Sequence, residues 1–241
     1  MFHGLWGIFA WLSFGLAIVF TLLVAIFVPG KARRQRLAKL ASKSVFMIPR
    51  IKVHAIGLEN LPTESCVVVA NHASYIDGVL LKGYLPARFS FVIKGEMREI
   101  PVAHFLLHRA GAKFVERNKH AGSARDARQI VKAALGGESL AFFPEGTFRK
   151  EPGVDRFRPG AFVAAVRGDM AVVPVAISGT RDMLPAGRLL PRPVAIRFEV
   201  LPAIRPADPE YGSSRALAET ARQRILAVLD EPDLLDESGG V

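Results

Sequence analysis

Cysteine is almost absent from this chain, because Cys66 is the only one among 241 residues. A single thiol cannot close a disulfide within the chain, so a small secreted fold stapled by disulfides is excluded. The sequence also has no cluster of Cys and His at the spacing of zinc ligands, and we expect no bound metal. Cys66 opens the apolar run 66–70, so we expect its side chain to be buried. We also expect the chain to lie in a reducing compartment.

Charge is missing from residues 5–28, a run of 24 residues rich in Phe and Leu. As a helix rising about 1.5 Å per residue, this run would be about 36 Å long, enough to cross a hydrocarbon core of about 30 Å. No Lys or Arg precedes it and no small-residue cleavage site follows, so a secretory signal peptide fits poorly. We predict a membrane-anchoring helix, which either spans the bilayer or dips into one leaflet.

Positive charge is concentrated directly after this run. The chain has a formal charge of +10, and residues 31–60 hold eight Lys or Arg and one acid. A basic block beside an apolar span is typical of contact with anionic lipid, so we predict membrane lipids and not nucleic acid as partners. The positive-inside rule places the N-terminus outside and the rest in the cytoplasm, at the inner membrane. Basic and apolar positions interleave over residues 31–48, which predicts an amphipathic helix on the lipid surface or against the domain.

From residue 51 onward, short apolar runs alternate with helical stretches. The predicted strands are 52–56, 66–70, 89–94, 112–116, 140–143, 171–177 and 194–200, and the predicted helices are 75–84, 101–110, 123–135, 161–166 and 214–229. Strands that are apolar throughout are typical of a sheet covered on both faces. We therefore predict an α/β fold with a mixed, mostly parallel sheet covered by helices. It would fill residues 51–230, after a membrane segment at 1–50 and before a disordered tail at 231–241.

A polar pair leaves the second predicted strand. Asn71 and His72 follow the buried run, and Asp77 lies five residues after the histidine. A strand end that turns into a helix could bring the side chains of His72 and Asp77 together. The carboxylate would then hold one imidazole nitrogen and leave the other to accept a proton from a hydroxyl. Taken alone, the pattern favours a polar loop in which Asn71 and Ser74 cap a helix.

A second polar segment follows a later predicted strand. It contains Glu145, Gly146 and Thr147, and then Arg149 and Lys150. The glycine permits a ligand to approach the backbone closely, and the two cations could bind a phosphate. Taken alone, the segment favours a turn with solvated charges.

Two further blocks complete the pattern. Arg117 falls at the end of the predicted strand 112–116, and the run 172–177 has the composition of a core strand. In this order the blocks resemble the glycerolipid acyltransferase family, typified by 1-acylglycerol-3-phosphate (lysophosphatidic acid) acyltransferase. The resemblance covers roughly residues 61–185 and is carried by four groups: Asn71-His72 with Asp77; Gly111, Phe114 and Arg117; residues 143–147; and residues 173–175. It is specific for the superfamily and much less so for the acceptor.

The resemblance implies that His72 is a general base, that Asp77 orients it and that Arg117 holds the acceptor phosphate. It also implies three residues that line the acceptor site, namely Glu145, Gly146 and Thr147. No cofactor is implied, because acyl-CoA or acyl-carrier protein would serve as co-substrate, with its chain in an apolar groove. The expected reaction gives phosphatidic acid from lysophosphatidic acid. The alternatives are another lyso-lipid acceptor such as lyso-ornithine lipid, or a non-enzymatic membrane lipid-binding protein.

One departure from the family pattern concerns the third group. The family places Arg directly after Thr, whereas here Phe148 intervenes and the arginine is Arg149. In an extended loop, a shift of one residue turns a side chain to the opposite face. Arg149 is therefore one candidate for binding the phosphate. Lys150 or Arg181 could take this role in its place.

Overall fold

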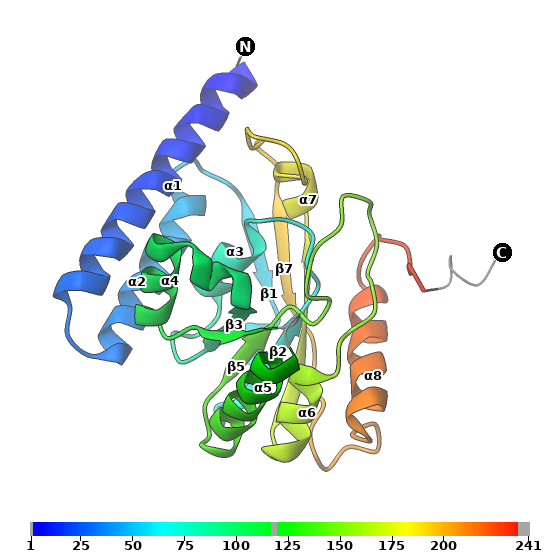
Figure 1. Cartoon of the computed structure of the whole chain (residues 1–241). Coiled ribbons are helices and arrows are strands. Elements are labelled where there is room, and N and C mark those ends of the chain that lie inside the picture. The colour runs from blue at the N-terminus through cyan, green and yellow to red at the C-terminus, as the bar shows by residue number, and fades with distance from the viewer. Residues whose placement is uncertain (1, 117–119, 236–241) are drawn as a thin grey trace.

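Two helices open the chain in the computed structural model, which describes residues 2–116 and 120–235 (Figure 1). They are α1 (Phe2–Phe27) and α2 (Lys31–Met47). Within the described residues, α1 is the one helix that is long and apolar enough to cross a membrane. The predicted apolar helix and the basic helix after it are therefore both present.

A seven-stranded sheet forms the centre of the described structure, in the order β1-β7-β6-β2-β5-β3-β4. The strands are β1 (Val53–Ile56), β2 (Cys66–Ala70), β3 (Ser90–Lys94), β4 (Lys113–Val115), β5 (Leu140–Phe142), β6 (Ala171–Ser178) and β7 (Ile196–Val200). The five strands β6, β2, β5, β3 and β4 run parallel. β7 is antiparallel to β6, and β1 is parallel to β7. The predicted α/β fold with a mixed, mostly parallel sheet is confirmed.

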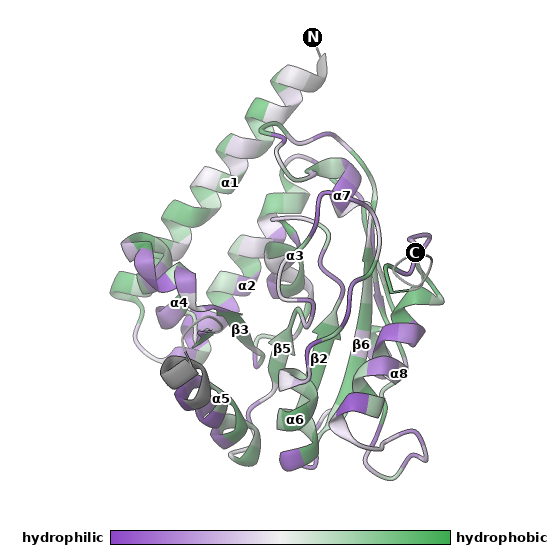
Figure 2. Ribbon diagram, turned by 45° about the vertical axis from the view of Figure 1, so that its right-hand side comes forward, coloured by the Kyte–Doolittle hydropathy of each residue, from purple (hydrophilic) through white to green (hydrophobic). Residues whose placement is uncertain are grey.

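Helices cover both faces of this sheet. They are α3 (Asp77–Tyr84), α4 (Pro101–Arg109), α5 (His120–Leu135), α6 (Gly160–Arg167), α7 (Thr180–Met183) and α8 (Ser214–Leu226), with two short 3-10 helices, η1 (Leu58–Asn60) and η2 (Gly95–Glu99). Figures 1 and 2 show α5, α6 and α8 together on one face, with α2 and α3 on the other. The sequence pattern did not predict α7, because four residues are too few to show helical periodicity.

The central strand β2 explains why its sequence does not alternate between apolar and polar residues. All five of its side chains are buried, and successive ones point to opposite faces. Val67 and Val69 pack with α5, α6 and α8, whereas Val68 and Ala70 pack with α2 and α3. Cys66 is fully buried in the second cluster, and burial raises the pKa of its thiol to about 11.

The C-terminal segment differs from the predicted disordered tail. Glu231 forms an ion pair with Arg181, Asp233 forms one with Arg222, and Asp233 also bridges to Val154. These acids find arginine partners that are distant in sequence or on another element, and composition alone gives no sign of such pairs. Residues 231–235 are therefore ordered against the domain, and residues 236–241 lie outside the described residues. The other predicted domain boundaries stay predictions.

Candidate active site

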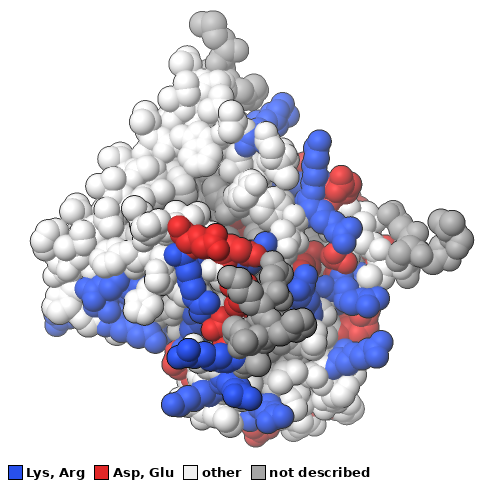
Figure 3. All heavy atoms as spheres, in the orientation of Figure 1, with Lys and Arg blue, Asp and Glu red and all other residues white. Residues whose placement is uncertain are grey.

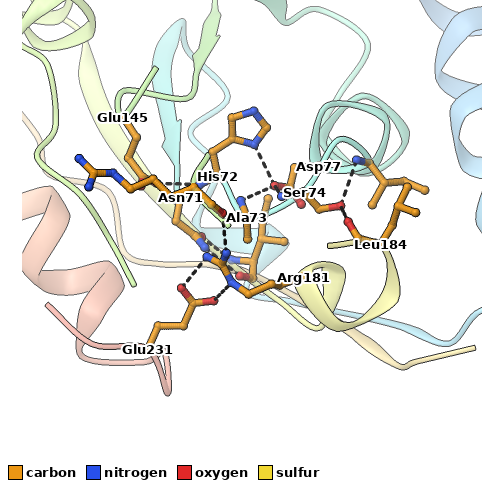
Figure 4. A network of polar contacts seen from close by, with 12 residues as sticks. Asn71, His72, Ala73, Ser74, Asp77, Glu145, Arg181, Leu184 and Glu231 are labelled. Atoms are coloured by element: carbon orange, nitrogen blue, oxygen red, sulfur yellow. Dashed lines mark hydrogen bonds and ion pairs between the residues drawn. The ribbon is translucent and has the colours of Figure 1, made fainter. Parts of the chain in front are cut away.

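The polar residues predicted from the sequence leave the carboxyl ends of neighbouring strands. Because β2, β5 and β6 are parallel, the residues that follow them meet at one edge of the sheet, where ligands commonly bind in α/β folds. Figure 4 shows Asn71 and His72 after β2, Glu145 after β5 and Arg181 after β6, all at this edge.

Asn71 joins β2 to β6 through its side chain. Its amide Nδ2 donates to the carbonyl of Ile177 at 2.9 Å, and its Oδ1 accepts from the N–H of Ile177 at 2.8 Å. The side chain thus takes the place of one pair of backbone hydrogen bonds to β6, so the backbone at the end of β2 is free to turn away from the sheet. This turn carries His72 out of the sheet. Asn71 therefore makes a structural link and does not cap a helix.

The structure brings His72 and Asp77 together. The imidazole Nδ1 lies 2.9 Å from Asp77 Oδ2, which also accepts the N–H groups of Ala73 at 2.7 Å and Ser74 at 2.8 Å. Asp77 is fully buried at the first turn of α3, where the helix dipole favours a negative charge. A carboxylate at Nδ1 favours a proton on that nitrogen, and no described residue bonds Nε2. The ring is therefore arranged to accept a proton at Nε2.

Two phenylalanine rings enclose this imidazole. Phe143 stacks on His72 with centroids 4.2 Å apart, and Phe148 meets it edge-on at 4.8 Å. Tyr75 packs in turn against Phe148 at 4.6 Å. The His72 side chain keeps 17% of its exposure. The residue that departs from the family pattern, Phe148, therefore forms part of the wall around the His72 ring, a contact that the sequence did not predict.

Glu145 is buried and uses both carboxylate oxygens on the backbone. Oε1 accepts the N–H of His72 at 2.7 Å, and Oε2 accepts the N–H of Asp155 at 3.1 Å. Burial raises the pKa of Glu145 to about 7, while these two hydrogen bonds oppose the rise. The geometry thus makes Glu145 a support for the His72 backbone, and its expected place in the lining of the acceptor site stays a prediction.

The next residues of this segment differ in exposure and pairing. Gly146 adopts a left-handed φ of 90° and its N–H closes a turn onto Phe143, a conformation that favours glycine. Thr147 is exposed beside it. Arg149 is 60% exposed and pairs with Asp155 at 2.6 Å.

Three further candidate phosphate ligands remain, of which Lys150 is exposed. Arg181 is held by Glu231, with Nη2 to Oε2 at 3.1 Å. Arg149 and Arg181, both candidates for binding a phosphate, therefore have acidic partners in this structure. Arg117 lies outside the described residues.

An apolar cavity of about 280 Å³ lies between α1 and the domain. Its lining comes from α1, α2, α3, the turn that follows His72, and α7 with the segment after it. The lining residues are Ala10, Trp11, Phe14, Val45, Ile51, Tyr75, Ile76, Val79, Met183, Leu184 and Pro191. Tyr75 and Ile76 lie in the turn between His72 and Asp77, so the cavity lies next to the turn that carries the imidazole. Its size and apolar lining suit an aliphatic chain.

Comparisons with known proteins agree with this arrangement. A sequence model of the acyltransferase family matches residues 50–178, more than half of the chain. The chain is 32% identical over 146 residues to a chloroplastic 1-acyl-sn-glycerol-3-phosphate acyltransferase of Arabidopsis thaliana, covering 60% of this chain and 41% of that protein. It is 35% identical over 125 residues to the lyso-ornithine lipid O-acyltransferase of Pseudomonas aeruginosa, covering 52% and 47% respectively.

A solved structure shows the same fold over almost the whole chain. The 1-acyl-sn-glycerophosphate acyltransferase PlsC of Thermotoga maritima superposes with a TM-score of 0.77 at 22% identity, covering 98% of this chain and 96% of that one. By contrast, the chain spans about half the length of the curated relatives it matches. The matched region contains the strand ends that carry His72, Asp77 and Glu145. This chain belongs to the acyltransferase family.

Proposed function

We propose that this chain is a membrane-bound O-acyltransferase that converts lysophosphatidic acid to phosphatidic acid, using acyl-CoA or acyl-carrier protein as donor. The observation that carries the proposal is the contact between His72 and Asp77 at 2.9 Å beside an apolar cavity. The names of the relatives support the reaction class, since both act on lyso-lipids or glycerol phosphates.

The proposed reaction needs one base and no covalent enzyme intermediate. His72 Nε2 accepts the proton of the acceptor hydroxyl while the hydroxyl oxygen attacks the thioester carbonyl. A C–O bond forms and the C–S bond breaks, and the leaving thiolate takes the proton back from the imidazolium. Asp77, fully buried and hydrogen-bonded at Oδ2, stabilises the imidazolium while it exists.

The cavity beside Tyr75 and Ile76 is the proposed site for an acyl chain. A chain lying there would leave its carbonyl end at the turn that carries His72. Each methylene buried in such a cavity contributes about 0.8 kcal/mol. The lining is apolar enough to bind by this effect alone, which leaves recognition of the headgroup to the loop after β5 and to Arg117.

We further propose that α1 inserts into one leaflet of the membrane. Near its start, Trp6 Nε1 donates to the carbonyl of Pro49 at 3.2 Å, and near its end Ala25 accepts from Arg109 Nε at 2.7 Å. These two positions of α1 are about 29 Å apart along a helix, nearly the thickness of the hydrocarbon core. Because one domain contacts both, crossing the bilayer would place parts of that domain on both sides. Insertion into one leaflet is therefore favoured over the crossing that the charge pattern predicts.

The outer face of α1 supports this attachment. Its exposed side chains are large and apolar, including Leu5, Ile8, Phe9, Leu12, Leu16 and Phe27. Figure 3 shows an uncharged surface over α1, with Lys and Arg gathered below it toward the end that leads into α2. An apolar face bordered by cations fits the boundary between acyl chains and anionic headgroups.

A second candidate is acylation of lyso-ornithine lipid. The relative from Pseudomonas aeruginosa carries that activity in its name. Phe148 also occupies the position where the family has a phosphate-binding arginine, and Arg149 is paired with Asp155. A non-enzymatic lipid-binding protein is a weaker candidate, because binding alone would not need the pair of His72 and Asp77.

The test of the reaction is acyl transfer by the purified full chain. Radiolabelled acyl-CoA is offered with lysophosphatidic acid, lyso-ornithine lipid or no acceptor, and the His72→Ala variant serves as the matched control. We expect labelled phosphatidic acid from the wild type and none from the variant. Product from lyso-ornithine lipid alone would establish the second candidate, and the absence of any acylated product would refute both.

The membrane arrangement is tested with a single accessible thiol. Gly4→Cys is introduced into a Cys66→Ala background, and a membrane-impermeant maleimide is added to vesicles of either orientation. One-leaflet insertion predicts that residues 4 and 47 are modified from the same side, with Met47→Cys in the same background as reference. Modification of the two positions from opposite sides would show that α1 crosses the membrane.

A further inference from the structure

The loop between β5 and α6, residues 143–159, contains the residues that support the proposed base. It forms no helix and contributes one isolated bridge residue, Val154. A backbone without regular structure needs hydrogen-bond partners elsewhere. Here the C-terminal segment supplies them: Val154 N–H donates to the carbonyl of Pro232 at 3.0 Å, and Gly153 N–H donates to Glu231 Oε2 at 2.9 Å.

Two arginines complete the attachment of this loop. Arg222 of α8 is fully buried, donates to the carbonyls of Val154 and Asp155 at 3.1 Å each, and forms an ion pair with Asp233. Arg181 of α7 plays a similar part nearer the start of the loop. Its Nη1 donates to the carbonyl of Arg149 at 2.9 Å, while the same guanidinium binds both oxygens of Glu231.

The loop that is held in this way leads directly to the imidazole. Asp155 N–H donates to Glu145 Oε2, and Glu145 Oε1 accepts the N–H of His72. Figure 4 shows Glu231, Arg181, Glu145 and His72 in one polar network at the edge of the sheet. The path from the C-terminal segment to His72 therefore consists of hydrogen bonds joined by the short backbone stretch from Gly153 to Asp155.

We propose that Glu231 and Arg181 are positioning residues for acyl transfer, which fix the loop 143–159 and thereby the backbone of His72. This inference rests on the proposed function. Neither side chain needs to touch a substrate in this role. Arg181 is instead occupied by Glu231, and both side chains are largely buried, with 13% and 14% exposure.

A second ion pair distinguishes positioning from general stability. Arg224 of α8 pairs with Glu210, and Arg224 also donates to the carbonyl of Pro202. This pair ties α8 to the segment before it, and within the described part of the chain neither side chain hydrogen-bonds to the loop. Glu210→Ala is therefore a matched control, because it also breaks an ion pair between an acid and an arginine. Asp233→Ala is a poor choice, because it would remove one of the two acids paired with the buried charge of Arg222 and would lower the stability of the whole chain.

The experiment compares Glu231→Ala, Glu231→Gln and Glu210→Ala with the wild type. For each, kcat, the KM of the acyl donor and the midpoint of thermal unfolding are measured in the same detergent. We expect Glu231→Ala to lower kcat by roughly tenfold to a hundredfold with an unchanged donor KM, since small misplacements of reacting groups have effects of this size. Glu231→Gln retains an acceptor for Gly153 N–H and should recover part of the rate. Glu210→Ala should keep the full wild-type kcat.

Two results would overturn the inference. One is a wild-type kcat in folded Glu231→Ala, and the other is an equal loss in Glu210→Ala. A wild type that transfers no acyl group would instead refute the proposed function. The positioning role then has a separate readout, the rate at which diethyl pyrocarbonate modifies His72, compared between wild type and Glu231→Ala. An unchanged rate would count against the positioning role.

Discussion

Glu145 accepts a hydrogen bond from the backbone N–H of His72 at 2.7 Å, although 73 positions separate the two residues. The contact joins the turn after β2 to the loop after β5. His72 is thereby held at its backbone by Glu145, at its ring edge by Asp77 and at its ring face by Phe143. A base fixed at three points loses little freedom when a substrate binds, which favours proton transfer in a defined direction.

The first prediction concerns the base and its acid. His72→Ala should abolish acyl transfer while the chain still folds and binds membranes, because the side chain is not part of either apolar core. Asp77→Asn should lower kcat by roughly 10²–10⁴-fold, since an amide can accept the N–H groups of Ala73 and Ser74 but cannot stabilise an imidazolium. Steady-state kinetics and circular dichroism of both variants check this. A rate near that of the wild type in folded His72→Ala would contradict the mechanism.

The second prediction uses the buried acid. Burial raises the pKa of Glu145 from 4.5 to about 7, so between these pH values the folded chain retains a proton that the unfolded chain has lost. The free energy of unfolding should therefore fall with rising pH over this window, by up to about 3 kcal/mol, and level off above it. Glu145→Gln removes the titration and should flatten the curve. Urea unfolding of both proteins across this range gives the difference, and parallel curves would disprove it.

The third prediction distinguishes the roles of two arginines, Arg117 and Arg149, in binding the acceptor. Arg117→Lys keeps the charge but loses the planar fork, so the KM for lysophosphatidic acid should rise strongly. Arg149→Ala should raise it less, because that side chain is paired with Asp155 and 60% exposed. The KM of the acyl donor, measured in the same assays, should barely move in either variant. Unaltered acceptor kinetics in Arg117→Lys would point to an acceptor without a phosphate monoester, such as lyso-ornithine lipid.

The fourth prediction concerns a substitution that partly fills the apolar cavity. Val79→Phe adds bulk to the wall opposite α1 and should move the preference toward shorter acyl chains. Each methylene that no longer fits should cost up to about 0.8 kcal/mol of binding, or roughly fourfold in kcat/KM. A series of acyl-CoA lengths checks this, with Val166→Phe on the exposed face of α6 as control. An identical length profile in Val79→Phe and wild type would place the chain elsewhere.

The regular elements of the fold could be predicted from the sequence because their signals are local. The strand 66–70 has the predicted bounds, since five consecutive small or β-branched apolar residues can be buried on both faces of a sheet. The helix predicted at 214–229 ends at Leu226, after which the chain leaves the helix at Ala227. Helix ends depend on local capping and contacts, which periodicity does not report.

The site was predictable only in part, for a physical reason. His72 and Asp77 are near in sequence, so a single turn brings them together and their spacing can be recognised. The contacts of Phe148 with His72 and of Glu231 with Arg181 join distant segments through side chains alone. No periodicity or composition encodes such pairs, because they depend on how loops from different strands meet.

The exposed apolar face of α1 also has a kinetic consequence. With α1 in the leaflet, as proposed, the enzyme would meet a lyso-lipid by lateral diffusion, so encounters would take place in two dimensions. The rate then follows the mole fraction of acceptor among the surrounding lipids rather than its amount in the whole sample. Adding inert phospholipid at a constant amount of acceptor would slow turnover, because it dilutes the acceptor within the surface. The effective concentration of a water-soluble acyl donor would stay the same. Under the proposed insertion, α1 would thus also define the concentration to which the enzyme responds.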